Sequence, residues 1–305
     1  MSVRPTSCLT QSREPMPTKS FQAPPPIPVR ELPQPELTED EADALYETTK
    51  EKPTPYLSSK GMRFVRESEH GVLNGETKYL LLRRVIDLHT AEIWGDFLRP
   101  LKYRNAGKAK RPCLKDSLGG TLDFGWFRDR NYGPRLFAGS IKHPDVYNGI
   151  LKFIVLIMED QVERHLPLYW KEQLKRARVN RARLIGSEYR DPRLPFRMFH
   201  DPILSSLVVN KDTTCRSHTD SNNKNGLSCM TVFGDFHGGE LVFPRLRLAF
   251  DVRPGDVLIA DTNREQHGND PNMAGERISV IAYLKQLPQR RPEPRAEKPT
   301  KSRLN

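Results

Sequence analysis

The chain has 305 residues, of which 36% are hydrophobic, and its 49 Lys and Arg outnumber its 38 Asp and Glu to give a net charge of +11. No apolar run approaches the length needed to span a bilayer, and the N-terminus lacks an apolar signal segment, so we expect a soluble intracellular protein with no membrane partner. Four cysteines without a C-x-x-C pair argue against a disulfide framework or a zinc ribbon, and the basic excess favours a polyanionic partner.

The two ends of the chain have the composition of poorly ordered segments. Residues 1–58 hold eleven of the 26 prolines, and we expect them to be largely disordered or partly polyproline II. Within them Thr38 and Glu41 form a capping-box pattern, which predicts a short acidic helix. Residues 289–305 form a basic tail, so the predicted folded domain spans residues 59–288.

A helical pattern follows between Asp145 and Arg183, with Ile150 and Ile154 at helical spacing. Pro167 is expected to split it into two helices. The first is expected to back a sheet. The second exposes a basic face, for which nuclear targeting, DNA contact and simple solvation all remain open.

Two segments before these helices combine positive charge with turn or aromatic residues. Residues 102–111, K-Y-R-N-A-G-K-A-K-R, predict a basic loop that either meets a phosphate backbone or is a solvated surface loop. Residues 123–135 mix aromatics with arginines, which suits base stacking beside phosphate contacts as well as an ordinary packed loop.

Short strands dominate the chain after Arg190. Turn residues separate them, among them Gly238-Gly239 and Pro254-Gly255-Asp256. Short strands preceded by helices predict an α+β fold with a double-stranded β-helix (jelly-roll) core buttressed by helices. The predicted strands are Leu204–Val209, Leu227–Phe233, Glu240–Phe243, Leu246–Val252, Val257–Asp261 and Ile278–Leu284.

Three polar residues in this region form a candidate metal site within residues 203–287. His218 and Asp220 are two apart at the end of a β-branched run, so on a strand both would point to one face. His267 follows another apolar run and is the candidate third ligand. Two His and one carboxylate with open positions are the facial triad of non-haem Fe(II) oxygenases. A second H-x-D, ending at Asp145, is instead interpreted as a helix N-terminus.

Arg277 and Ser279 follow His267 by ten and twelve residues. A guanidinium beside a hydroxyl suits a dicarboxylic cosubstrate, because Arg grips a carboxylate with two parallel hydrogen bonds. Strand alternation puts Arg277, Ser279 and Tyr283 on one face. Asn210, on the strand leading to His218, is a further candidate for the near carboxylate or keto group of that cosubstrate.

The order H-T-D, distal His, R-x-S resembles the Fe(II)/2-oxoglutarate dioxygenases. The details H-T-D-S-N-N and R-I-S-V-I-A-Y are most similar to the TET/JBP-like branch, in particular its small fungal members. The resemblance implies Fe(II) and 2-oxoglutarate as cofactors, with O2 as cosubstrate. It also implies that Tyr283 stacks an extruded base and that Asn223 contacts it.

The same resemblance implies the substrate and the location. We expect a nuclear, monomeric enzyme that flips a methylated base out of double-stranded DNA and oxidises 5-methylcytosine to 5-hydroxymethylcytosine and further. Lys285 stands where the TET pattern has a base-contacting histidine, so N6-methyladenine demethylation is the second substrate hypothesis. The cysteine-rich zinc region of animal TET enzymes has no counterpart here, so other elements must position DNA.

Two rival functions remain at this point. G-G-E-L-V-F-P, residues 238–244, also resembles prolyl hydroxylases, although these hold the cosubstrate with lysine where Arg277 stands. The alternatives are therefore a prolyl-hydroxylase-like protein hydroxylase and a non-catalytic DNA-binding module that kept the fold.

Overall fold

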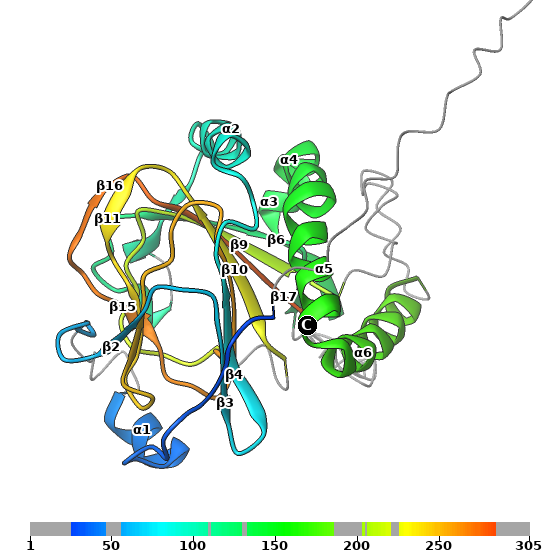
Figure 1. Cartoon of the computed structure of the whole chain (residues 1–305). Coiled ribbons are helices and arrows are strands. Elements are labelled where there is room, and N and C mark those ends of the chain that lie inside the picture. Colours follow the sequence, from blue (N-terminus) through cyan, green and yellow to red (C-terminus); the bar gives the residue numbers. More distant parts are fainter. Residues whose placement is uncertain are drawn as a thin grey trace, which may run out of the picture.

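The protein consists of two facing β-sheets with helices packed on the outer side of the larger one (Figure 1). The computed structural model describes residues 26–46, 56–108, 111–129, 133–185, 203–204, 206–220 and 226–284. None of the helices in these residues is long and apolar enough to cross a membrane.

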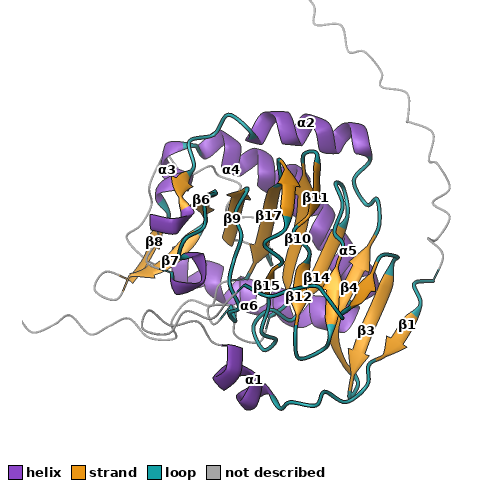
Figure 2. Cartoon of the chain, turned by 90° about the vertical axis from the view of Figure 1, so that its left-hand side faces the viewer, coloured by secondary structure: helices purple, strands orange, loops and turns teal. Residues whose placement is uncertain are grey.

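The large sheet has nine strands, and its central strands run side by side in the view of Figure 2. Their pairing is antiparallel except at one edge, where the first two strands are parallel. In spatial order they are β1 (Val29–Glu31), β3 (Glu69–Leu73), β4 (Glu76–Leu82), β14 (Val257–Ala260), β10 (Ser228–Phe233), β17 (Ile278–Tyr283), β9 (Ser206–Lys211), β6 (Gly120–Phe124) and β5 (Arg104–Asn105).

The smaller sheet has four strands and faces the middle of the large one. Its order is β15 (Gly268–Asn269), β12 (Leu241–Phe243), β13 (Leu248–Phe250) and β2 (Arg63–Val65). Two ribbons complete the β structure: β11 (Phe236–Gly238) with β16 (Met273–Gly275), and β7 (Trp126–Asp129) with β8 (Gly133–Leu136). The predicted jelly-roll core with helical support is confirmed.

Alternation along the strands sends side chains into two separate cores. On β4, Leu80 and Leu82 pack toward the helices, whereas Tyr79 and Leu81 pack between the two sheets. Successive side chains on a strand point to opposite faces, so one strand serves both cores. The inner face of β9 and β17 differs, because there the same alternation lines a cavity instead of a second core.

The helices are α1 (Glu39–Tyr46), α2 (Leu88–Leu98), α3 (Ala138–Lys142), α4 (Pro144–Ile150), η3 (Leu151–Val155), α5 (Leu156–His165) and α6 (Pro167–Ile185), with short 3-10 turns η1 (Ala106–Lys108) and η2 (Pro112–Leu114). The segment η3 is a π-helical turn between α4 and α5. Buried Ile150, Ile154 and Met158 from these elements pack on the large sheet, as predicted.

Two predicted helix boundaries are confirmed. The helical run breaks before Pro167, which lacks the N–H needed to continue a helix and starts α6 instead. The second H-x-D precedes a helix, because Pro144 and Asp145 form the first turn of α4. Helix α2 was not predicted, although Asp87 caps it by accepting a hydrogen bond from the backbone N–H of Thr90 at 2.9 Å.

Part of the segment expected to be largely disordered is folded. Strand β1 pairs in parallel with β3, and Leu32 beside it is buried. The predicted acidic helix forms as α1, with the capping box between Thr38 and Glu41 in place at 2.9 and 3.2 Å. The high proline content predicted disorder here, but β1 lies at a sheet edge, where nearby prolines are tolerated, and the buried side chain of Leu32 holds the segment on the sheet.

Candidate metal centre and cosubstrate pocket

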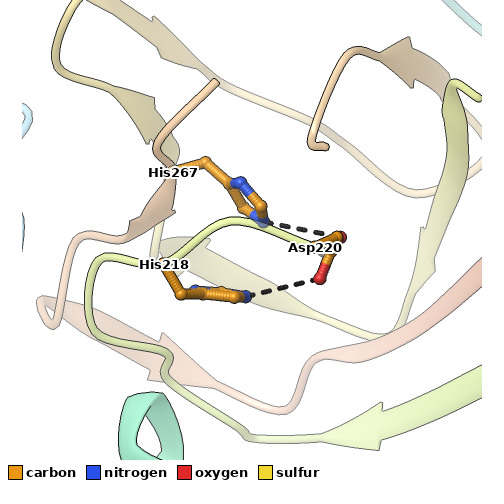
Figure 3. A group of neighbouring side chains, drawn as sticks. All are labelled: His218, Asp220 and His267. Atoms are coloured by element: carbon orange, nitrogen blue, oxygen red, sulfur yellow. Dashed lines mark ion pairs between the residues drawn. The ribbon is translucent and has the colours of Figure 1, made fainter. Parts of the chain in front are cut away.

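His218, Asp220 and His267 meet at one point, as Figure 3 shows. The Nε2 atom of His218 lies 3.7 Å from Oδ1 of Asp220, and Nε2 of His267 lies 3.7 Å from Oδ2. All three donor atoms lie within 4.8 Å of one another. These distances leave room for one ion between them, and no other such cluster of three occurs in the described part of the chain.

The backbone around the ligands differs from the predicted strand. Strand β9 ends at Lys211, and residues 212–217 connect it to His218. His218 instead forms an isolated antiparallel bridge with His267, in which each backbone N–H donates to the other carbonyl at 2.9 Å. The ligands are therefore brought together by this bridge rather than by a common strand.

Both imidazoles are oriented by their own chain. Nδ1 of His218 lies 2.9 Å from the carbonyl oxygen of Arg216, and Nδ1 of His267 lies 3.0 Å from that of Glu265. A carbonyl only accepts, so Nδ1 carries the proton in each ring and Nε2 offers its lone pair. This is the tautomer a metal needs.

The charges at the centre also suit a divalent cation. Burial, followed by the neighbouring His267, lowers the pKa of His218 to about 4, so its ring is neutral at physiological pH. Burial acts to raise the pKa of Asp220, but His267 and His218 hold it below its ordinary value. A neutral imidazole at His218 and an ionised carboxylate at Asp220 are the protonation states in which these two groups bind metal.

The triad forms part of the wall of a cavity of about 460 Å³. This volume lies in the range of small-molecule sites. The same wall contains every other described residue that the sequence assigned to the site, namely Asn210, Arg277, Ser279 and Tyr283. The predicted face of β17 is thus the cavity face.

Arg277 is a buried cation without a carboxylate partner among the described residues. Its Nη2 donates to the carbonyl oxygen of Thr213 at 3.0 Å and its Nη1 to that of Gly239. Burial lowers the pKa of Arg277, although a guanidinium stays charged in proteins. A buried charge held only by neutral carbonyls is a site for an anion.

Gly239 and Ser279 shape the surroundings of that guanidinium. Gly239 has φ +69°, and a Cβ there would lie 2.8 Å from Nη1 of Arg277, so only glycine allows this approach. Ser279 pairs directly with Asn210 across β17 and β9, which puts a hydroxyl and an amide side by side on the cavity wall. These groups fit a dicarboxylic acid bound between Arg277 and the metal.

The remaining base-side candidates divide into two groups. Tyr283 lines the cavity at the end of β17, and burial raises the pKa of its hydroxyl, so the ring is neutral. Asn223 and Lys285 lie outside the described residues. The roles of Tyr283 and Asn223 in binding a base stay predictions.

Arg111 and Cys113 are among the cavity-wall residues that were not assigned to the site from the sequence. Arg111 lines it and donates to the buried carboxylate of Asp123 at 3.0 Å, which Arg104 also contacts. Cys113 lies beside Cys215 in the wall, and burial raises the pKa of Cys113 to about 11. The basic run of residues 102–111 was the sequence feature that could have indicated Arg111 as a site residue. Cys215, predicted to be a buried thiol, is half-buried and outside the metal triad.

Comparisons with known proteins agree with this geometry. Residues 143–286 match the family model described as the oxygenase domain of the 2OGFeDO superfamily, Tet_JBP. The bifunctional helicase and thymine dioxygenase JBP2 of Leishmania infantum is 37% identical over 89 residues, which cover 27% of this chain and 8% of that protein. JBP2 of Trypanosoma brucei brucei is 34% identical over 97 residues, or 30% of this chain and 9% of that protein.

A solved structure shares the fold. NgTET1 in complex with 5mC DNA superposes with a TM-score of 0.50 at 14% identity, covering 76% of this chain and 80% of that one. Fold and donor set together define the class as a jelly-roll oxygenase with sites for Fe(II) and 2-oxoglutarate. Within that class, residues 143–286 resemble the TET/JBP oxygenase domain, so the predicted likeness is confirmed over this segment. The chain spans less than a tenth of the length of these JBP2 relatives.

Proposed function

We propose that this chain is an Fe(II)/2-oxoglutarate-dependent dioxygenase that oxidises methyl groups on bases of double-stranded DNA. The observation that carries the proposal is one cavity with three parts: the donor set of His218, Asp220 and His267, the buried guanidinium of Arg277, and the aromatic ring of Tyr283. A metal centre, an anion site and a stacking surface in one enclosure are what such a reaction requires.

Each part of the wall has its own task in this reaction. His218, Asp220 and His267 would hold the iron and leave coordination positions open. Arg277 and Ser279 would bind the far carboxylate of 2-oxoglutarate, with Asn210 near its other end. With O2 and 2-oxoglutarate, bound Fe(II) supplies the oxidation of a C–H bond coupled to release of succinate and CO2. The protein contributes binding, orientation and exclusion of water, and needs no general base for that step.

A methyl group inside a duplex cannot reach a metal enclosed in this cavity. The target nucleotide therefore has to leave the helix, at a cost of a few kcal/mol. Stacking of the base on the Tyr283 ring would offset much of that cost, since base–aromatic stacking contributes about 1–3 kcal/mol. Asn223 is the proposed polar contact to the base.

We propose 5-methylcytosine as the leading substrate, oxidised to 5-hydroxymethylcytosine and further. The names of the similar proteins support a 5-methylpyrimidine: the JBP2 proteins are thymine dioxygenases and the NgTET1 complex contains 5mC DNA. N6-methyladenine is the second candidate, because lysine at 285 replaces the base-contacting histidine of the TET pattern. Hydroxylation there would release formaldehyde and adenine.

DNA would approach along the basic segment that leads to the cavity. The exposed side chains of Lys102, Arg104, Lys108 and Arg111 belong to this segment, and its continuation, Pro112 to Leu114, forms part of the cavity wall. Such cations bind phosphates mainly by releasing counterions. A nuclear, monomeric enzyme is the corresponding proposal for location and assembly.

Succinate release tests this function against its rivals. Purified protein with Fe(II), ascorbate and 2-oxoglutarate is supplied with methylated duplex, the unmethylated duplex of the same sequence, or proline-rich peptides. Stimulation by the methylated duplex alone is expected. Stimulation by the peptides would favour the protein hydroxylase, and no iron-dependent succinate with any substrate would leave a DNA-binding module.

A further inference from the structure

One loop, residues 261–267, holds all three candidate metal ligands in place. It supplies His267 itself, and the backbone bridge of His267 fixes His218. It also fixes Asp220, whose N–H donates to the carbonyl oxygen of Thr262 at 2.9 Å and whose carbonyl accepts from the Asn263 amide at 3.3 Å. Displacing this loop would move every ligand.

Behind the loop lies a buried network of charges. Glu265, with a fully buried side chain, accepts from Nε of Arg245 at 2.8 Å, and its Oε1 lies 3.1 Å from Nζ of Lys78. Lys78 and Arg245 are themselves 3% and 8% exposed. Burying a carboxylate costs several kcal/mol unless cations and hydrogen bonds compensate it, so Arg245 and Lys78 stabilise Glu265 where both reach its carboxylate.

Glu265 transmits that position to a ligand. Its backbone carbonyl is the acceptor for Nδ1 of His267 at 3.0 Å, so the residue that anchors the loop also sets the ring orientation. Lys78 adds a second anchor, because its carbonyl accepts from the N–H of Asp261 at 2.9 Å. Outer contacts of this kind commonly change metal affinity.

A helix distant in the sequence completes the network. Glu39, the first residue of α1, lies 3.6 Å from Nζ of Lys78 and 3.7 Å from Nη2 of Arg245. Its charge joins those of Asp261 and Glu76, which lie 3.7 and 3.8 Å from Nζ of Lys78, in offsetting the repulsion between the two cations that share Glu265. Docking of α1 is supported by Ala42, which is 1% exposed.

We propose that Glu265, Lys78 and Arg245 are positioning residues for the metal centre and that Glu39 makes helix α1 part of this device. The N-terminal helix would thus tune metal affinity without contributing a ligand. This inference rests on the metal site of the proposed function.

Co(II) binding to the full chain, measured by titration calorimetry and by the visible absorption of the bound ion, tests the inference. The variants are Glu265→Gln and Glu39→Gln. Glu36→Gln is the matched control, because Glu36 lies in the same segment but pairs with exposed Arg247. Thermal unfolding of each metal-free protein is measured in parallel.

We expect Glu265→Gln to weaken Co(II) binding about tenfold or more, within the range of outer-contact changes, and Glu39→Gln to weaken it about threefold. Glu36→Gln should bind as the original chain does, and Glu39→Asp, which keeps the charge, should recover part of the loss. If Glu265→Gln does not fold, the Co(II) affinity of Glu39→Gln, at a half-exposed position, tests the inference by itself.

A purely structural network would give another result. The variants would then unfold at lower temperature without metal, yet their folded fraction would bind Co(II) with the original affinity and spectrum, which overturns the inference. Failure of the unaltered chain to bind Co(II) would instead remove the metal site itself, and both proposals with it.

Discussion

His218 and His267 lie in the same antiparallel bridge, and each donates its backbone N–H to the other's carbonyl at 2.9 Å. The two rings consequently lie with centroids 4.4 Å apart. Backbone hydrogen bonds between the two residues therefore set the spacing of the donor pair. Preorganisation of this kind favours tight binding.

The first prediction concerns these ligands. Changing His218 or Asp220 to Ala should weaken Co(II) or Fe(II) binding by more than about 100-fold, above the usual effect of outer contacts, and abolish succinate release. DNA affinity, measured by fluorescence anisotropy, should stay within about twofold because phosphate contacts dominate it. His237→Ala, at an exposed position on β11, is the control. A comparable loss of DNA affinity would assign the residues to folding or DNA binding.

Arg277 should control the requirement for 2-oxoglutarate. A hydrogen bond to a charged group contributes about 1.5–3 kcal/mol, so Arg277→Ala should raise the KM for 2-oxoglutarate about 10- to 100-fold. Arg277→Lys should recover only part, because an ammonium lacks the planar fork. Arg164→Ala, on the exposed side of α5, serves as control. An unchanged KM would remove the anion-site assignment.

Tyr283 should matter for the DNA substrate and not for the cosubstrate. Tyr283→Ala is expected to lower kcat/KM for methylated duplex about 5- to 100-fold through lost stacking, while Tyr283→Phe keeps most of it. Succinate formed slowly without DNA should be the same in all three proteins. An equal loss for Ala and Phe would indicate a hydroxyl contact instead of stacking.

Glu159 gives the fold a pH dependence that is independent of the site. Burial raises its pKa to about 7, although its carboxylate accepts the N–H of Leu204 at 2.9 Å. In the unfolded chain the Glu159 carboxyl has its ordinary pKa of 4.5, so between about pH 4.5 and 7 only the folded state keeps the proton. The free energy of unfolding therefore falls as pH rises through this range.

Glu159→Gln removes the cost of that buried charge. The free energy of unfolding at pH 8 should rise by up to about 3 kcal/mol, while at pH 4 the variant and the original should be similar. Denaturant unfolding at both pH values measures the difference, with Glu163→Gln, exposed on the same helix, as control. A gain of the same size at both pH values would mean that charge is not the cause.

The sequence predicted the cavity face of β17 because period-two alternation needs only local information. Arg277, Ser279 and Tyr283 line one cavity for that reason. The break between α5 and α6 at Pro167 also has a local cause, the missing N–H of proline. The contact of Glu265 with Arg245 had no such signal, because nothing in the chain order relates an acidic loop residue to a cation twenty residues earlier.

Strand β1 and the bridge at His218 were missed for a similar reason. Parallel pairing of β1 with β3 joins residues about forty positions apart, and its three residues carry no strong strand pattern. His218 was expected at the end of a strand, whereas residues 212–217 form a connection outside any strand, with bends at 212 and 217, that the apolar pattern does not indicate. Such nonlocal contacts follow from tertiary packing.

Nucleoside mass spectrometry of methylated duplex DNA tests whether this protein oxidises methylated bases. The DNA is incubated with the protein, Fe(II), ascorbate and 2-oxoglutarate, then digested, with the Asp220→Ala variant alongside. We expect loss of 5-methylcytosine and appearance of 5-hydroxymethylcytosine, matched by succinate and absent with the variant. Succinate formation with every methylated base intact would contradict it.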